Sequence, residues 1–334
     1  VAIEAVAGDD VVNTHRVLAV MYLVVDLAIA AALGRWWRPA TGVAYLLAGL
    51  PLLPMGYVRF DLWATGLAVI AAAALVRNRG AVTATATTAG ALVKVWPAML
   101  VFAAVAIRRT GTAFATMVTG AAAGLAWLAY AGGSLEAVNQ VVSLRGATGW
   151  HVESVAGSLT ALVTDATPAR QLDAFRIGTL DPRLVAAGRL LTLAAAVGLV
   201  VLGRRATPGP NQTPTPDPTG AVRVGDEIVV GAVTLGATAA MVVTAPLLSP
   251  QFLLWLTPWV AIVATSPGGC TGAVTWASAA AIGLTGLVLG VWSPPELAGT
   301  TPAALLLARD AALVAVVVGT ARLLWHHGTA AEGR

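Results

Sequence analysis

The sequence is poor in charged residues, in cysteine and in lysine, and each shortage excludes a class of protein. Only 11% of its 334 residues are charged and 57% are hydrophobic, whereas soluble domains are roughly a quarter charged. Together with a mean hydropathy of +0.80, this excludes a soluble globular enzyme. The single cysteine, Cys270, excludes an internal disulfide and a cysteine-clustered metal site. A net charge of +4 is too small for a nucleic-acid-binding surface, so the composition indicates a polytopic membrane protein.

Long apolar runs fill most of the chain. A helix needs roughly 20 apolar residues to cross the hydrocarbon of a bilayer. We expect an all-α, polytopic bundle of about ten or eleven membrane helices. Long runs predict spans at 17–34, 40–56, 112–131, 185–203, 228–248, 270–292 and 303–325, and shorter runs lie at 62–76 and 252–265.

Arginine indicates how these helices are oriented, because Lys and Arg collect on the cytoplasmic side. The clusters are Arg35/Arg38, Arg77/Arg79, Arg108/Arg109, Arg204/Arg205/Arg223 and Arg322 with the C-terminal tail. If all are cytoplasmic, the stretch 81–107 must enter the membrane and return on the same side. We therefore expect two short helices, 81–93 and 95–107, which meet at Lys94. The alternative is one long tilted helix with a misplaced arginine cluster.

This topology gives an N-terminal membrane half, 1–206, which contains one larger extracytoplasmic loop, 132–184. A Pro-rich cytoplasmic linker, 207–224, joins it to a C-terminal membrane half, 225–334, and the C-terminus is cytoplasmic. Val1 would lie outside without a signal peptide before it. We therefore expect at least one further transmembrane helix upstream.

Lys94 is the strongest single candidate for function, because it is the one lysine and lies in an apolar stretch. Intramembrane charges are costly and usually face a cavity or a partner, although Lys94 could also snorkel to the interface. At the outer tip of a hairpin it would offer a compact charge to a phosphate. Arg59 and Asp61 lie in a short external turn. They form either a solvated ion pair or, beside Lys94, a cationic pocket with a carboxylate.

Three further groups of polar residues are candidates. The external segment from Arg145 to Ser154 combines charged, aromatic and hydroxyl side chains, as sugar binding requires, and its candidates are Arg145, Trp150, His151, Glu153 and Ser154. Ser249 and Gln251 close the outer end of another helix pair, where we assign the following Trp255 and Trp259 to the interfacial aromatic belt. Asp26 lies in mid-span, where it either pairs with another helix or has a functional role.

Several short motifs resemble glycosyltransferase family 87, and the resemblance covers roughly residues 15–325. The matching motifs are Arg59-Phe60-Asp61, Arg77-Asn78-Arg79, Leu92 to Pro97, Arg108-Arg109, Arg145-Gly146, Trp150 to Ser154, and Leu248 to Phe252. The family comprises bacterial GT-C-type membrane enzymes, best known as polyprenol-phosphate-mannose-dependent alpha-mannosyltransferases of actinobacteria. The resemblance implies a multi-pass cell-membrane hexosyltransferase that transfers a sugar, mannose in the first instance, to a lipid or glycan acceptor on the extracytoplasmic face.

The resemblance also implies roles for the candidate residues. It implies a reaction that uses no cofactor, no metal and no nucleic acid. Lys94, Arg59 and Arg145 would bind the donor phosphate. The residues that would bind the sugar or the acceptor are Asp61, Trp150, His151, Glu153, Ser154, Ser249 and Gln251. GT-C enzymes carry their catalytic acid in the first external loop, so we expect the base upstream of Val1 rather than at Asp9 or Asp10. Gln251 stands where mannosyltransferase members often have histidine, which leaves the donor sugar open.

Two other functions compete with this one. A secondary transporter would use Lys94 and Asp26 as intramembrane coupling charges, but transporters usually show internal repeats, and we find no convincing repeat. A non-catalytic scaffold would have dispersed external polar residues. For the enzyme we expect Arg59, Asp61, Lys94, His151 and Glu153 to converge on one external cavity. An apolar groove should lead from that cavity to the lipid.

Overall fold

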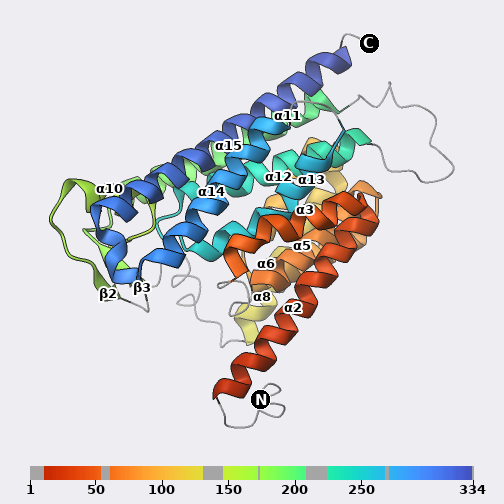
Figure 1. Cartoon of the computed structure of the whole chain (residues 1–334). Coiled ribbons are helices and arrows are strands. Elements are labelled where there is room, and N and C mark those ends of the chain that lie inside the picture. The colour runs from red at the N-terminus through yellow and green to blue at the C-terminus, as the bar shows by residue number, and fades with distance from the viewer. Residues whose placement is uncertain are drawn as a thin grey trace.

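The computed structural model describes residues 11–53, 61–130, 146–171, 174–207, 224–267 and 271–332. Figure 1 shows a bundle of helices in which long and short helices pack together, with a small region of strands at one end. Within the described residues, six helices are long and apolar enough to cross a membrane. The chain is therefore a membrane-embedded helical bundle.

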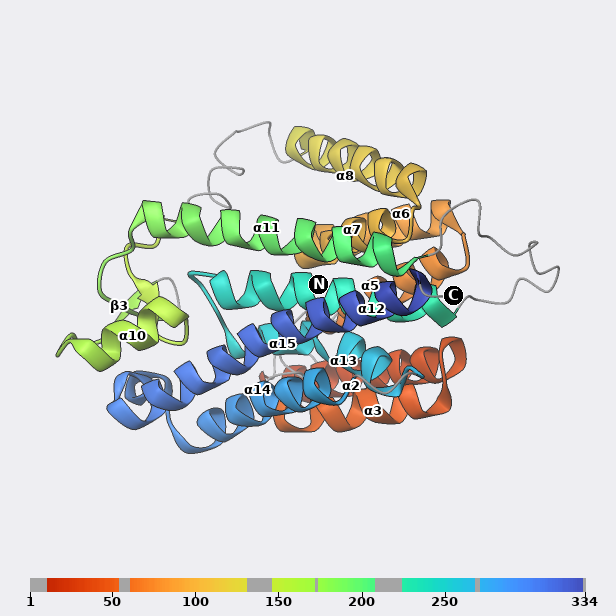
Figure 2. The same ribbon diagram turned by 90° about the horizontal axis from the view of Figure 1, so that it is seen from above.

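The six long helices coincide with six of the predicted spans. They are α2 (Val11–Trp36), α8 (Thr110–Tyr130), α11 (Pro182–Ala206), α12 (Val224–Thr244), α14 (Gly272–Val291) and α15 (Thr300–Glu332). Helix α12 is the central one, since it packs against both α11 and α15 and most of its side chains are buried. Figure 2 shows α8 at the edge of the bundle, beside α6 and α7.

One predicted span is only partly described, because residues 54–56 lie outside the described residues. The run 40–56 does not form one long helix, because α3 (Pro39–Gly49) has 11 residues and passes into a 3-10 turn, η1 (Leu50–Leu52). Pro51 lies in that turn, and proline cannot donate the backbone hydrogen bond that would continue the α-helix. The shorter predicted runs form α5 (Asp61–Val76), η5 (Pro250–Trp255) and α13 (Thr257–Thr265).

The predicted break at Lys94 is confirmed. Helix α6 (Gly80–Val93) ends there, where Lys94 has an extended backbone with φ −150° and ψ 137°. The turn η2 (Trp96–Met99) contains Pro97, and α7 (Leu100–Ala106) then leads to Arg108. The residue before a proline disfavours helical geometry, and Trp96-Pro97 follows Lys94 almost directly. The stretch 81–107 is thus a helical hairpin rather than one continuous helix.

The expected external loop contains a compact substructure that an all-α prediction missed. Its described part holds β1 (Trp150–His151), α10 (Val155–Val163), β2 (Ala169–Gln171) and β3 (Ala174–Ile177). The strands form an antiparallel sheet in the order β1-β3-β2, with His151 opposite Arg176. The turn η6 (Pro294–Ala298) packs against α10 and β3. This substructure fixes the position of Trp150 to Ser154.

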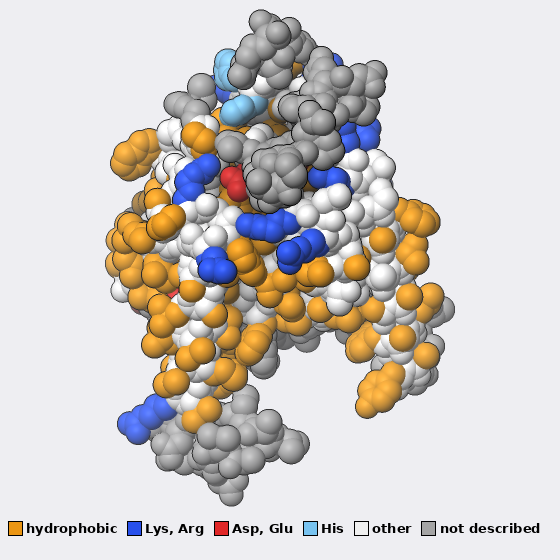
Figure 3. Space-filling model, turned by 90° about the vertical axis from the view of Figure 1, so that its right-hand side faces the viewer, with side chains coloured by type: hydrophobic (Ala, Val, Ile, Leu, Met, Phe, Trp, Pro, Cys, Tyr) orange, Lys and Arg blue, Asp and Glu red, His pale blue; other side chains and the backbone are white. Residues whose placement is uncertain are grey.

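The arginine clusters gather at the other end of the bundle, as the sequence predicted. Arg77 donates to the carbonyl of Trp36 at 2.7 Å, and Arg108 donates to the carbonyl of Arg204 at 3.0 Å. Arg205 lies over the ring of Trp325. Figure 3 views this end of the molecule, where Lys and Arg side chains spread across the face. The charge asymmetry between the two ends is therefore a property of the folded molecule.

The two predicted membrane halves share one hydrophobic core. Its buried residues come from both sides of the Pro-rich segment, for example Leu33, Leu100 and Leu199 with Val233 and Leu313. The segment itself lies outside the described residues, apart from Thr207 and Val224.

Candidate functional site

The first polar centre consists of Lys94, Asp61 and Trp255, and we call it the Lys94 centre. Asp61 is the first residue of α5 and is fully buried. The Lys94 Nζ lies 3.7 Å from Asp61 Oδ1, and the Lys94 side chain is 34% exposed. Trp255 Nε1 donates to the same carboxylate oxygen at 2.7 Å. A buried carboxylate thus accepts a hydrogen bond from a ring N–H and faces an accessible ammonium group.

Helix geometry explains this position. A carboxylate is favoured at a helix N-terminus, where backbone N–H groups and the helix dipole carry partial positive charge. Asp61 occupies that position in α5, and the end of α6 brings Lys94 to it. Both residues lie at the ends of their helices opposite to Arg77 and Arg79. The Lys94 centre is therefore on the face away from the arginines.

Aromatic rings surround the Lys94 centre. Trp96 stacks on Trp255 with ring centroids 5.7 Å apart, and Phe252 also stacks on Trp255, with centroids 4.2 Å apart. Trp259 meets Trp96 edge-on at 6.3 Å. The assignment of Trp255 and Trp259 to an interfacial belt is wrong, because both are buried. Their neighbours are other rings and, for Trp255, a buried acid.

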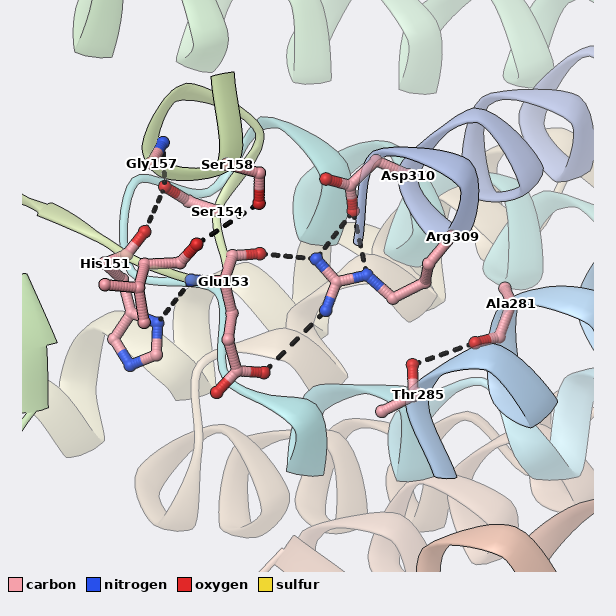
Figure 4. Close-up of polar contacts among 10 residues, drawn as sticks. His151, Glu153, Ser154, Gly157, Ser158, Ala281, Thr285, Arg309 and Asp310 are labelled. Carbon is pink, nitrogen blue, oxygen red and sulfur yellow. Dashed lines mark hydrogen bonds and ion pairs between the residues drawn. The ribbon is translucent and has the colours of Figure 1, made fainter. Parts of the chain in front are cut away.

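The second polar centre, the Arg309 centre, consists of Arg309, Asp310 and Glu153 (Figure 4). Arg309 is completely buried in α15. Its Nε and Nη2 donate to Asp310 Oδ1 at 2.9 and 2.8 Å, and Nη2 also donates to the Glu153 carbonyl. Its Nη1 lies 3.8 Å from Glu153 Oε2. One buried cation is therefore shared by two carboxyl groups.

The loop that carries Glu153 is held by short polar contacts. Ser154 caps α10, since its Oγ accepts from the Gly157 N–H at 3.1 Å and donates to the His151 carbonyl at 2.7 Å. A Cβ at Gly157 would lie 2.0 Å from that carbonyl oxygen, so the turn requires glycine. The Glu153 N–H donates to His151 Nδ1 at 3.3 Å. The side chain of Glu153 thereby points to α15.

Burial sets the protonation of this loop. It raises the pKa of Glu153 to about 7, with Arg309 opposing the shift and Asp310 adding to it. It lowers the pKa of His151 to about 4, helped by the positive charges of Arg176 and Arg309. His151 is therefore neutral at pH 7 and Glu153 exchanges its proton near neutrality. A group with a pKa near the working pH is suited to general acid or base chemistry.

An apolar groove of about 560 Å³ leads away from the Arg309 centre. Trp150, Ser154 and Asp310 lie along it, and its walls come from α10, α11, α12 and α15 and include Leu184, Leu191, Val243 and Val314. Leu184 and Leu191 are largely exposed and face the surroundings of the bundle. This groove is apolar and lies beside a polar centre, but none of the described residues expected to form one external cavity lines it.

Two atoms at this site lack hydrogen bonds within the described part of the chain. They are Asp310 Oδ2 and Arg309 Nη1, both buried. A buried polar atom without a partner costs roughly 1–3 kcal/mol. A hydroxyl group, which both donates and accepts, would satisfy either atom. Because Asp310 lies along the groove, this end of it is chemically suited to a ligand with hydroxyl groups.

The connection 245–255 joins the two centres. The His151 N–H donates to the Pro246 carbonyl at 3.2 Å, and Trp255 at the other end donates to Asp61. Ser249 is the N-cap residue of η5, and Gln251 is buried with no hydrogen bond to its Oε1 from the described residues. The candidates thus fall into two linked groups. Arg59 and Arg145 lie outside the described residues, so convergence on one cavity stays a prediction.

Arg309 and Asp310 are functional candidates that the sequence analysis does not assign. The available signal was two adjacent opposite charges in the apolar run 303–325. Asp26 is explained by a partner on another helix, because Tyr45 Oη donates to its Oδ1 at 2.5 Å.

The described residues contain no group of three or more His, Cys, Asp or Glu side chains arranged to hold a metal ion. Comparison with protein-family models, with curated proteins and with solved structures gives no match for the chain.

Proposed function

We propose that this protein is an integral membrane glycosyltransferase that uses a polyprenyl-phosphate sugar as donor. It transfers one sugar, with mannose the first to test, to a lipid or glycan acceptor on the extracytoplasmic face of the cell membrane. The arginine-rich end, which includes the C-terminus, is then cytoplasmic, in keeping with the positive-inside rule.

The observation that carries the proposal is the groove beside the Arg309 centre. A lipid-linked sugar has a long apolar chain and a hydroxyl-rich head. The groove offers apolar walls along α11, α12 and α15, and its inner end offers Asp310, Ser154 and the ring of Trp150. Apolar surface removed from water contributes about 25 cal/mol per Å², which favours binding of the chain. The same geometry would suit a glycolipid acceptor.

In the proposed reaction the bond between sugar C1 and the donor phosphate breaks, and the acceptor oxygen bonds to C1. The acceptor hydroxyl loses its proton to a carboxylate, and polyprenyl phosphate leaves with the bonding electrons. Glu153 suits the role of base because its pKa of about 7 allows it to take a proton near neutrality. The family resemblance implies a base upstream of Val1, and Glu153 is the alternative candidate among the described residues. Lys94, with Arg59 and Arg145, would stabilise the phosphate.

The test is a transfer assay in vesicles that contain polyprenyl-phosphate mannose and extracted glycolipid acceptors. Glu153→Gln should reduce transfer by roughly 10²–10⁴, the usual contribution of a general acid or base. Glu296→Gln is the matched control, because Glu296 is exposed in η6 beside α10. Equal activity of both variants would remove Glu153 as the base. Absence of transfer by the wild-type protein with any polyprenyl-phosphate sugar would contradict the proposed function.

A secondary transporter is the second candidate, favoured by the break between α6 and α7 at a charged residue. Transporters bind substrate at broken helices near the membrane midplane. At this break Lys94 pairs with Asp61, and on α2 Asp26 pairs with Tyr45. A transporter would move labelled sugar into sealed vesicles without releasing polyprenyl phosphate. The enzyme would release polyprenyl phosphate without such accumulation.

A further inference from the structure

At the arginine-rich end, three arginines surround a pocket that the proposed reaction does not use. The pocket has a volume of about 510 Å³ and is lined by Arg35, Arg77 and Arg79 together with Trp36, Ile70, Ala73, Ala74 and Val82. These residues come from the end of α2, the end of α5 and the start of α6. No carboxylate is among the residues that line it.

Arg77 is fixed within this pocket. Its Nη1 donates to the Ala73 carbonyl at 2.9 Å, and its Nη2 donates to the Trp36 carbonyl at 2.7 Å. These carbonyls belong to the last turns of α5 and α2, where helix carbonyls lack intrahelical partners. Arg77 still has further N–H groups, because a guanidinium carries five. It is therefore oriented before any ligand binds.

The other two arginines retain their donors. Arg35 and Arg79 are exposed, and neither side chain makes a hydrogen bond or ion pair with the residues that the structure describes. The positive charge of Arg79 acts on Arg77, so the two guanidinium groups repel. Glu227 on α12 offsets part of the positive charge of Arg77, and it also pairs with Arg38 at 3.7 Å. The pocket therefore has an excess of positive charge that a bound anion would offset.

An apolar groove of about 260 Å³ continues from the pocket between α2 and α5. It shares Trp36 and Ile70 with the arginine pocket, and its remaining lining is Val25, Ala28, Ile29, Ala32, Trp63, Gly66, Leu67 and Val69. On α2 the spacing of Val25, Ala28, Ile29 and Ala32 is that of one helix face. A Cβ at Gly66 would meet the Ile29 side chain at 3.5 Å, an ordinary contact distance, so a larger side chain at this position would occupy the groove.

From this shape and charge we infer that the site binds one anionic phospholipid of the leaflet at the arginine-rich end. The phosphate would contact Arg35, Arg77 and Arg79, and one acyl chain would lie in the groove between α2 and α5. Basic pockets between transmembrane helices bind anionic headgroups in this way. Arginine suits the role because its planar fork binds phosphate through two parallel hydrogen bonds. The site is independent of the proposed transfer reaction.

The test measures lipid retained by the purified full chain, by native mass spectrometry from nanodiscs of mixed phosphatidylglycerol and phosphatidylcholine. The variant Arg35→Gln with Arg79→Gln should lose phosphatidylglycerol binding by roughly tenfold to thirtyfold. Its matched control is Arg109→Gln with Arg322→Gln, which removes the same charge at the same end outside the pocket. A loss of equal size in the control would show general attraction to the membrane and overturn the proposal.

Two further measurements distinguish binding of a phospholipid from binding of a free anion. Gly66→Leu keeps every charge but fills the groove, so phosphatidylglycerol retention should fall while the arginines remain. Glycerol phosphate at millimolar concentration should not displace the lipid, because it lacks an acyl chain. Unchanged retention in Gly66→Leu, or displacement by glycerol phosphate, would leave an anion site without a lipid and contradict the inference.

Discussion

The Lys94 centre and the Arg309 centre both place a cation beside buried carboxyl groups, yet they balance charge differently. Lys94 meets one acid, Asp61, and keeps part of its side chain accessible. Arg309 is wholly buried and meets two acids, Glu153 and Asp310. A single cation can neutralise only one carboxylate. The excess acid of the Arg309 centre must therefore bind a proton or an external partner.

This difference indicates different chemistry. In the Lys94 centre one lysine faces a buried carboxylate, and its partly exposed ammonium group is suited to electrostatic contact with an anion. In the Arg309 centre the excess acid is Glu153, whose pKa of about 7 permits proton exchange. The connection 245–255 joins the two centres physically. A transferase needs both a phosphate contact and a proton acceptor, and the two centres separate these tasks.

The largest effect is expected for Arg309→Met. This change leaves two buried carboxyl groups without their cation, and breaking a buried ion pair in this way costs roughly 3–5 kcal/mol. Thermal unfolding in detergent should show a strongly lowered midpoint. Adding Asp310→Leu should recover much of the loss, since Glu153 alone can become neutral. No recovery would mean that Arg309 stabilises the fold through packing rather than charge.

Lys94→Met should reduce transfer by roughly 10²–10³, the usual loss for one electrostatic stabiliser. The vesicle transfer assay measures this. The double variant Lys94→Met with Asp61→Asn separates two roles of Lys94, because it removes the buried charge that Lys94 balances. If Lys94 contacts the donor phosphate, the double variant stays inactive. Recovered transfer would show that Lys94 only neutralises Asp61.

Stability should depend on pH through Glu153. Its pKa is raised from 4.5 to about 7 in the folded state, so the folded protein binds more protons than the unfolded chain between these values. The free energy of unfolding should therefore fall as pH rises, by roughly 1.4 kcal/mol per pH unit between pH 5 and 7. Glu153→Gln should remove this slope, whereas Glu296→Gln should keep it. Unfolding midpoints in detergent across this range provide the measurement.

The smallest effect is expected for Trp255→Phe. The ring stacking with Trp96 and Phe252 stays, but the donor to buried Asp61 is lost, at a cost of about 1–2 kcal/mol. Thermal unfolding compared with Trp276→Phe, which changes an exposed ring, checks this. An equal effect of the two changes would contradict a specific role for the indole N–H.

The length of the apolar runs could predict most helices, because a bilayer requires roughly 20 apolar residues for each span. The arginine clusters at both ends of the stretch 81–107 were enough to predict the helix break at Lys94. In the run 40–56 the α-helix passes into a 3-10 turn at Leu50, beside Pro51, which hydropathy alone did not predict. The small sheet was missed because its strands have only two to four residues. Such strands are fixed by their partners rather than by their own pattern.

The sequence by itself determined that this is a membrane protein with arginine at one end, because hydropathy and charge are properties of the residues alone. It also marked Lys94, Asp61 and Glu153 as unusual. Only the tertiary structure decided their partners. Asp61 meets Trp255 across 194 residues, and Arg309 meets Glu153 across 156. Contacts at such separations depend on how the helices pack, and helix packing is not encoded in any local pattern.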